Sequence, residues 1–220
     1  MKRTIALLSC LLAVCSTAFA ETPPALSRGD IVFFGHYEQD DISSDGFEAI
    51  EWIVLKTDEG TALLISRYAL DCVPFHIVKA SVTWETCSLR SWLNDTFYSR
   101  AFTEEEQARI VISEVSPDPN PRFASSPGAP TQDRVFLLSG AEAETYLRSD
   151  AARTCAATPY ARKHGAIVNE NACWWLLRTP GVNDHSVACV NSNGKIGYGG
   201  YDVNRETVAL RPAIVLRLSD

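Results

Sequence analysis

Cysteines supply the most reactive side chains of this 220-residue sequence, which contains seven of them. Cys10 and Cys15 fall within an apolar leader, and the other five are spread over the rest of the chain: Cys72, Cys87, Cys155, Cys173 and Cys189. Five thiols form at most two disulfides and leave one thiol over, and spacing alone does not fix the pairing. We expect Cys173 to pair with Cys189, because both lie on short predicted strands near the carboxyl terminus, and Cys72 to pair with Cys87.

Two other uses of cysteine are favoured less. A nucleophilic thiolate needs a positive and partly exposed setting, whereas Cys173 precedes Trp174 and Trp175 in an apolar run. His164 or His185 could act as its base, but no spacing supports this. Zinc sites use closely spaced ligands, and the sequence has no CxxC and no histidine near a cysteine pair. We therefore expect no cofactor.

Serine and carboxylate chemistry has little support either. The G-x-S-x-G motif of serine hydrolases is absent from the sequence. Glu48 with Glu51, or the acidic run 104–106, would serve a glycosidase only at a separation that a sequence does not show. Charge at a helix start and solvated loops explain these residues more simply. The sequence therefore predicts no catalytic residue.

One acidic loop resembles part of a calcium site. Asp40, Asp41, Asp45 and Gly46 follow one another closely, but no glutamate stands at the twelfth position of an EF-hand pattern. Turn chemistry also places Asp and Gly together in loops. We therefore expect no metal site here.

The strongest candidate for a binding surface is the aromatic loop Gly197-Tyr-Gly-Gly-Tyr. Flat rings supply apolar contact area, and amide and carboxylate groups beside them orient a sugar or a peptide. We expect ligand contacts from six aromatic, amide and acidic residues: Tyr198, Tyr201, Asn191, Asn193, Asp184 and Asp202. The alternative is a plain loop whose tyrosines cover the edge of the core.

The amino terminus predicts export. Residues 1–20 begin with Lys2 and Arg3, continue with a short apolar run and end in Ala-Phe-Ala20, which is the pattern of a cleaved signal peptide. Cleavage after Ala20 leaves a leader, 21–29, and one globular domain, 30–220. We expect a secreted, periplasmic or surface-bound protein. The apolar run is shorter than the roughly 20 residues of a membrane-spanning helix, so we expect no membrane span.

Charge disfavours two classes of partner. Without Lys2 and Arg3, the 20 basic residues of the chain fall to 18 against 27 acidic residues, a net charge of −9. Such a domain has no electrostatic attraction to nucleic acid or to anionic membranes. We expect no nucleic-acid partner, and a glycan or a protein as the ligand.

Apolar runs predict strands at both ends of the chain. The first is Asp30–Phe34, and the next two, 50–55 and 62–66, form a hairpin around a turn with Asp, Glu and Gly. Later strands are predicted over 173–178, 186–190, 194–198 and 208–218. Pro212 cannot donate to a ladder and must lie at an edge or a bulge. We expect Asp30–Phe34 to pair with Val208–Leu218.

Helices are predicted between these two groups of strands. Trp84, Leu89 and Trp92 recur at helical spacing and predict a helix over 85–94. Thr103 and Ser139, each with glutamate three residues later, are capping boxes that start two further helices, while five prolines in 116–132 predict a surface loop. Strands, helices and strands in that order predict a single α+β domain with mixed, mostly antiparallel sheets and two or three short helices.

Eight segments together resemble the bacterial domain of unknown function numbered 6273. They occur in the order GDIVFFGHYEQD, IEWIVL, ALLISRYALD, TWETCSLRSWLN with TFYSRAF, DRVFLLSGAEAETYL, ATPYARKHGA, CWWLLRTPG and LRPAIVLRL. The resemblance runs from about Asp30 to Leu218. It implies an exported or surface bacterial protein and carries no established activity.

The carboxyl-terminal pattern is also distantly similar to the C-type-lectin-like and formylglycine-generating-enzyme group. CWWLLRTPG, the NSNG turn and LRPAIVLRL match its tryptophan-rich strand, loop region and last strand. That resemblance implies paired terminal strands and a ligand-facing loop region. The lectin motifs Glu-Pro-Asn and Trp-Asn-Asp are absent, and no copper-binding cysteine pair can be placed.

These features predict a secreted or surface-associated binding module for a glycan or a peptide. One alternative is an enzyme of formylglycine-generating or another type that uses Cys173 or Cys189. Another is a structural accessory domain that docks on a surface protein.

Overall fold

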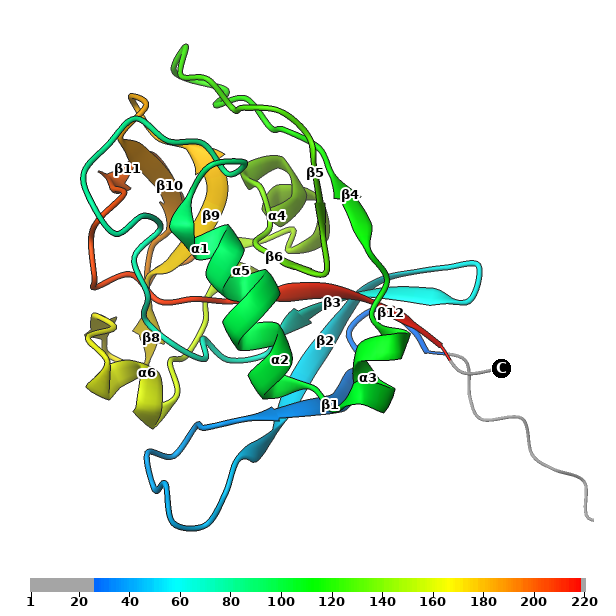
Figure 1. The fold of residues 1–220 in the computed structure, drawn as a ribbon. Coiled ribbons are helices and arrows are strands. Elements are labelled where there is room, and N and C mark those ends of the chain that lie inside the picture. The colour runs from blue at the N-terminus through cyan, green and yellow to red at the C-terminus, as the bar shows by residue number, and fades with distance from the viewer. Residues whose placement is uncertain (1–25, 219–220) are drawn as a thin grey trace, which may run out of the picture.

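Two antiparallel sheets dominate residues 26–218, the part of the chain that the computed structural model describes (Figure 1). The larger has the order β1-β2-β3-β12-β6, with β1 (Ile31–Tyr37), β2 (Glu48–Asp58), β3 (Thr61–Ser66), β6 (Val135–Phe136) and β12 (Ala213–Arg217). The smaller has the order β11-β10-β9, with β9 (Trp175–Pro180), β10 (Ser186–Val190) and β11 (Ile196–Asp202). Two short ladders join β4 (Ser113–Val115) to β5 (Thr131–Asp133) and β7 (Val168–Asn169) to β8 (Ala172–Cys173). The predicted α+β class with mostly antiparallel sheets is confirmed.

The predicted hairpin is the pair β2 and β3. Asp58 lies opposite Thr61, so Glu59 and Gly60 form a two-residue turn. Both have positive φ, 29° and 80°, as a turn that matches the right-handed twist of its strands requires. Local turn chemistry therefore sets the register of this part of the sheet.

The first and last strands are not neighbours, so the expected pairing of Asp30–Phe34 with Val208–Leu218 is wrong. β1 pairs with β2, whereas β12 lies between β3 and β6. As an interior strand, β12 has both edges hydrogen-bonded, and three of its five residues are buried, which explains its apolar sequence. Pro212 directly precedes β12, and its missing N–H therefore interrupts no ladder.

Helical segments are more numerous than the two or three expected. They are α1 (Ser88–Trp92), a π-helical stretch (Leu93–Phe97), α2 (Tyr98–Ala101), α3 (Glu104–Arg109), α4 (Gly140–Tyr146), α5 (Asp150–Arg153) and α6 (Pro159–Lys163). The first three are consecutive and extend the helix predicted over 85–94 to residue 101. Both capping boxes, at Thr103 and Ser139, are confirmed. α5 and α6 have only four and five residues, too few for a periodic signal.

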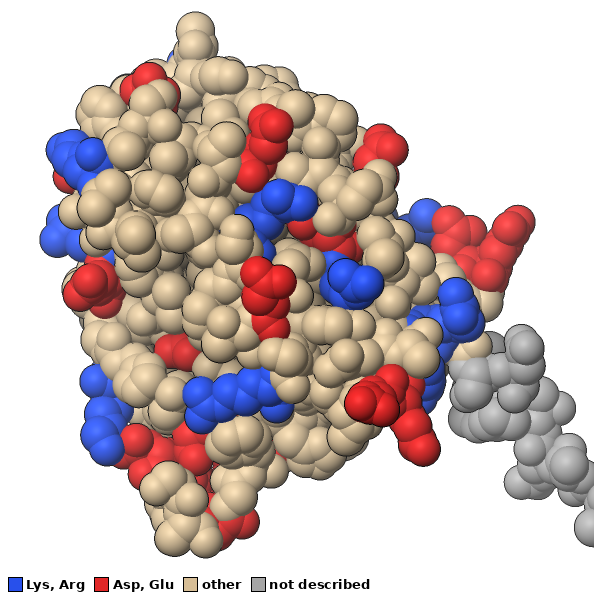
Figure 2. All heavy atoms as spheres, viewed as in Figure 1, with Lys and Arg blue, Asp and Glu red and all other residues tan. Residues whose placement is uncertain are grey.

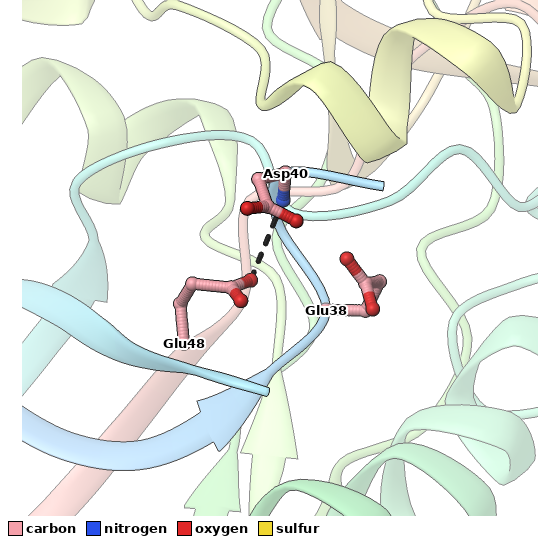
Figure 3. Close-up of side chains that lie close together, drawn as sticks. All are labelled: Glu38, Asp40 and Glu48. Atoms are coloured by element: carbon pink, nitrogen blue, oxygen red, sulfur yellow. Dashed lines mark hydrogen bonds between the residues drawn. The ribbon is translucent and has the colours of Figure 1, made fainter. Parts of the chain in front are cut away.

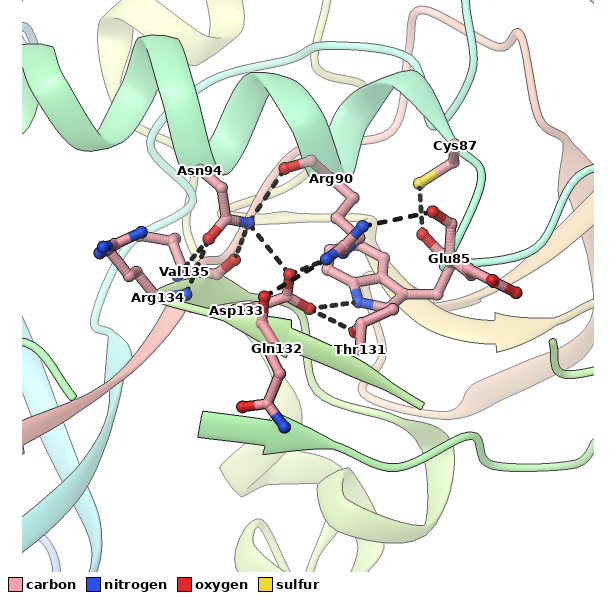
Figure 4. Close-up of polar contacts among 10 residues, drawn as sticks. Glu85, Cys87, Arg90, Asn94, Thr131, Gln132, Asp133, Arg134 and Val135 are labelled. Carbon is pink, nitrogen blue, oxygen red and sulfur yellow. Dashed lines mark hydrogen bonds and ion pairs between the residues drawn. The ribbon is translucent and has the colours of Figure 1, made fainter. Parts of the chain in front are cut away.

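A buried carboxylate, Asp133, joins the long helix to the strands (Figure 4). Its side chain is completely buried and accepts hydrogen bonds from Trp84 Nε1 at 2.9 Å, Arg90 Nε at 2.6 Å and Thr131 Oγ1 at 2.6 Å. A buried charge is stable only when it is paired and hydrogen-bonded. Two donors from the helical segment and one from β5 meet that requirement together.

Asn94, one turn after Arg90, makes the second connection (Figure 4). Its Nδ2 donates to the Val135 carbonyl at 2.9 Å, and its Oδ1 accepts from the Arg134 backbone N–H at 2.7 Å. The helix is therefore attached to the chain that leads into β6. The TWETCSLRSWLN segment thus supplies Trp84, Arg90 and Asn94 to one structural junction.

The predicted signal peptide, residues 1–20, lies outside the described residues. Among residues 26–218, no helix has both the length and the apolar character needed to cross a bilayer.

We predict that Asp133→Ala destabilises the fold strongly. The substitution leaves Trp84, Arg90 and Thr131 without their buried acceptor, so the free energy of unfolding should fall by about 3 kcal/mol. Urea unfolding followed by tryptophan fluorescence measures this change. Glu114→Ala, an exposed acidic residue of the adjacent strand, is the control and should change the value by less than about 0.5 kcal/mol. Equal effects of the two substitutions would contradict the assigned role of Asp133.

Candidate functional site

A polar hollow of about 350 Å³ lies beside the turn between β10 and β11. We call it the Tyr198 hollow, and it is lined by Arg122, Glu144, Asp150, Arg153, Asn191, Lys195, Ile196 and Tyr198. These residues come from the proline-rich loop, from α4, from α5, and from the β10–β11 turn with the start of β11. The hollow therefore forms only when four distant segments of the chain pack together.

The turn at residues 191–194 forms one wall and is packed tightly against α5. Gly194 has a φ of +81°, and a Cβ atom at this position would lie 1.8 Å from the Asp150 carbonyl oxygen. Only glycine fits a left-handed backbone in such close contact. Arg153 Nε also donates to the Gly194 carbonyl at 2.8 Å. This contact holds Asn191 and Lys195 at the edge of the hollow.

Tyr198 forms the aromatic part of the lining. The residue is 5% exposed, and its hydroxyl donates to Glu144 Oε1 at 3.0 Å. Burial and the hydrogen bond to Glu144 raise the pKa of Tyr198 to about 12. The Arg122 guanidinium lies 5.3 Å from the centre of the ring, within the range of a cation–π contact.

Asn120 fixes the proline-rich loop that carries Arg122. Its Nδ2 donates to the Pro180 carbonyl at 2.7 Å and to the Tyr198 carbonyl at 2.8 Å, and its Oδ1 accepts from the Arg122 N–H at 2.9 Å. The residue is buried. The segment 116–132, predicted only as a surface loop, is therefore attached to the smaller sheet at this point.

The charges of the hollow divide into paired and unpaired groups. Arg153 pairs with Asp150 at 2.5 Å and donates to the Leu147 carbonyl at 2.6 Å, and Glu144 accepts from Tyr198. Arg122 and Lys195 are exposed and form no ion pair within residues 26–218. The two cations therefore remain for a ligand, whereas Asn191 Oδ1 already accepts a hydrogen bond from the Cys189 thiol at 3.6 Å.

The structure brings together only two of the six expected ligand contacts, Asn191 and Tyr198. Asn193 lines a neighbouring hollow of about 360 Å³ with Thr154 and residues 169–172. Tyr201 packs on Trp174, with ring centres 5.0 Å apart. Tyr198 and Tyr201 therefore have different surroundings, although they are only three positions apart in the sequence.

The two expected acids, Asp184 and Asp202, anchor a loop. Ser81 Oγ donates to Asp184 Oδ2 at 2.7 Å, and this bond and that from His185 lower the pKa of Asp184 despite some opposing desolvation. Lys79 pairs with Asp202 at 3.0 Å. Both acids thus attach the 79–81 segment to the smaller sheet, outside the Tyr198 hollow.

Sequence reasoning missed Arg122, Glu144, Asp150, Arg153 and Lys195. Lys195 follows the NSNG turn directly and could have been found from that turn. The other four lie 42 to 73 residues before Lys195 in the sequence, and only packing brings them to the turn. No pattern in the sequence reports such a contact.

The cysteines are also arranged differently from the expectation. All five of residues 26–218 are free and buried, so neither the Cys173–Cys189 nor the Cys72–Cys87 disulfide is present. The Cys173 N–H donates to the Cys155 carbonyl at 2.8 Å, and the Cys155 thiol lies within hydrogen-bonding distance of the Arg67 and Ala156 carbonyls, at 3.5 and 3.4 Å. Cys189 instead lies opposite Leu176 and Gly197 in the smaller sheet. Cys155 is thus the cysteine next to Cys173.

A buried arginine lies beside these two thiols. Arg211 is 1% exposed, donates from Nε to the Ser66 carbonyl at 2.9 Å, and has an unpaired Nη1. Burial alone would raise the pKa of Cys155, but the neighbouring Cys173 thiol and the charge of Arg211 lower it. The neighbouring Cys155 thiol and burial raise the pKa of Cys173.

No histidine forms a hydrogen bond to a cysteine within the described residues. His164 Nδ1 lies 2.9 Å from Asp71 Oδ1, and the Tyr37 hydroxyl donates to Asp71 Oδ2 at 2.5 Å. Cys72, which follows Asp71, contacts the carbonyl oxygens of Glu206 and Val208. Its pKa is raised to about 12 by burial and by the charges of Asp71 and Glu206. His164 therefore has an acidic partner and not a thiol.

Comparison with known protein families adds one match. Residues 59–218 match the family described as Domain of unknown function (DUF6273). The chain belongs to this family. No curated protein and no solved structure matches the chain. The DUF6273 match begins in the β2–β3 turn and ends after β12, so it includes every residue that lines the Tyr198 hollow.

We predict that oxidation of the folded protein joins Cys155 to Cys173, because these two thiols are adjacent. The reduced protein would be treated with oxidised glutathione, and the disulfide located by peptide mapping under non-reducing conditions. Cys189→Ser should leave the linked peptide unchanged, whereas Cys155→Ser should remove it. A Cys173–Cys189 peptide from the unsubstituted protein would contradict this assignment.

We also predict that Cys72, Cys87 and Cys189 react slowly in the reduced, folded protein. Burial is the main cause that raises the pKa of each to about 12, which lowers the thiolate fraction at pH 8 roughly 1,000-fold from that of an ordinary thiol. Labelling by iodoacetamide, followed by mass spectrometry, should be far faster for these three residues in guanidinium chloride than in buffer. Rapid labelling of Cys189 without denaturant would contradict the prediction.

Proposed function

We propose that this DUF6273 protein is an exported binding module that takes a glycan or a peptide in the Tyr198 hollow. The observation that carries this proposal is the presence of two unpaired cations, Arg122 and Lys195, beside a buried aromatic ring and an amide. Binding sites commonly combine apolar or aromatic lining with a few polar groups that orient the ligand. The leader pattern at residues 1–20 supports export.

The unpaired groups favour a ligand that carries a carboxylate. Arginine binds carboxylates through two parallel N–H groups, and Lys195 adds a second positive charge across the same hollow. The Arg122 guanidinium over the Tyr198 ring is held in a defined position. An acidic sugar or an acidic peptide therefore fits the hollow better than a neutral ligand of the same size.

A C-type-lectin-like architecture belongs to the same proposal. Its support is the Trp174-Trp175 pair at the start of β9, the small antiparallel sheet that contains this strand, and a loop-rich region on that sheet that carries the hollow. The described chain also begins and ends at one end of the larger sheet, where Gly29 N–H donates to Val54 and Leu218 N–H to Gly60, both at 2.8 Å.

The enzyme alternative has weaker support. It requires a thiolate at Cys173 or Cys189, and the pKa of both thiols is raised. Both residues are also fully buried. The accessory-domain alternative differs from our proposal in its partner, because it predicts binding to a folded surface protein and no response to isolated glycans or peptides.

We predict that the mature chain binds acidic glycans or peptides on arrays, and that Arg122→Ala with Lys195→Ala weakens the hit. Loss of two charge-assisted contacts should raise the dissociation constant at least about tenfold. This dissociation constant would be measured by isothermal titration calorimetry with a synthetic sample of the glycan or peptide that the array identifies.

Lys56→Ala is the matched control, because this exposed lysine lies on β2 outside the Tyr198 hollow. It should bind the array hit with unchanged affinity. A double variant that binds as well as the unsubstituted protein would exclude the hollow as the site, and arrays without any specific hit would favour the accessory-domain alternative.

A further inference from the structure

Three carboxylates gather where the chain passes from β1 to β2 (Figure 3). Glu38 directly follows β1, Glu48 begins β2, and Asp40 lies in the loop between them. One carboxylate oxygen of each residue lies within 4.8 Å of the others. In Figure 2 acidic side chains gather over this loop, at the lower left of the molecule.

Glu38 is the unusual member of this acidic cluster. The residue is 3% exposed, and its Oε1 accepts from the Asp41 and Ile42 N–H groups at 2.8 and 3.2 Å. Its Oε2 is buried and has no hydrogen-bond partner. A buried anionic oxygen without a partner is costly, so the loop lacks one positively charged or proton-donating group at this position.

The nearby cation does not neutralise the cluster. Lys163 pairs with Asp41 at 2.6 Å and is largely exposed. Within residues 26–218, no lysine, arginine or histidine forms an ion pair with Glu38, Asp40 or Glu48. Three negative charges therefore lie close together with only backbone N–H donors, such as Gln39 N at 2.6 Å from Glu48, to stabilise them.

The donor atoms indicate which ligand would suit the cluster. Calcium binds six to eight oxygen atoms at about 2.3–2.6 Å, so two of its ligand oxygens lie at most about 5 Å apart. Oxygen ligands without histidine or cysteine favour a hard cation over zinc or copper. Asp40 and Glu48 are half-buried, which leaves one side of the cluster open to water ligands.

We propose that Glu38, Asp40 and Glu48 form a calcium-binding site that fixes the β1–β2 loop. This proposal departs from our expectation, from the sequence, of no metal site in this loop. Its residues also differ from Asp40, Asp41, Asp45 and Gly46, which resemble part of a calcium site, since Asp41 pairs with Lys163. The site is separate from the Tyr198 hollow and does not depend on the proposed ligand there.

The test is calcium binding by the mature chain after treatment with a chelator. Isothermal titration with CaCl₂ should show one site with a dissociation constant on the order of 0.1–1 mM, as in extracellular calcium modules. Calcium should also raise the midpoint of thermal unfolding, because a ligand that binds only the folded state stabilises it. Magnesium should bind more weakly.

Three substitutions identify the ligands. Asp40→Asn and Glu48→Gln each remove one charge from a half-buried position, so both variants should fold, and each should weaken calcium binding at least about tenfold. Glu38→Gln should abolish the calcium-dependent rise in the unfolding midpoint. Asp45→Asn is the matched control, because Asp45 is exposed in the same loop but outside the acidic cluster, and it should bind calcium normally.

Two results would overturn the proposal. One is the absence of any heat or stabilisation with calcium at about 10 mM, well above the expected dissociation constant. The other is unchanged calcium affinity in both Asp40→Asn and Glu48→Gln, which would place the cation elsewhere on this acidic chain.

Discussion

The buried carboxylate of Asp133 connects the long helix to the strands. It lies at the end of β5 and accepts hydrogen bonds from Trp84, which precedes the helix, and from Arg90 in its first turns. A charge inside a protein is tolerated only when several donors surround it. The helix, β5 and the chain entering β6 are therefore joined at this carboxylate and at Asn94, and β6 in turn lies beside β12 in the larger sheet.

The position of β12 extends this dependence to the whole chain. The last strand lies between β3 and β6, so residues from the beginning, the middle and the end of the sequence share one sheet. Directly before β12, Arg211 is buried and reaches the Ser66 carbonyl. The thiols of Cys155 and Cys173 lie beside this guanidinium. The larger sheet and the cysteine pair are thus connected through the start of one strand.

The two candidate sites differ in how they are built. The acidic cluster comes from one short stretch between neighbouring strands, so the β1–β2 pairing is sufficient to form it. The Tyr198 hollow requires Asn120 to attach the proline-rich loop and Gly194 to contact α5. Its unpaired cations have different origins, since Arg122 comes from that loop and Lys195 from the β10–β11 turn. A local site and a site of distant segments therefore coexist on one domain.

The sequence by itself determined the β2–β3 hairpin and the capping boxes at Thr103 and Ser139, which rest on turn and cap chemistry within a few positions of the chain. It also determined the α+β class, from the order of the predicted elements, and the family, from segments spread along the chain. Tertiary structure alone decided that β12 lies between β3 and β6, that Cys155 is adjacent to Cys173, and that Arg122 meets Tyr198. Those contacts join segments 18 to more than 100 residues apart, and their energy comes from packing that no local pattern encodes.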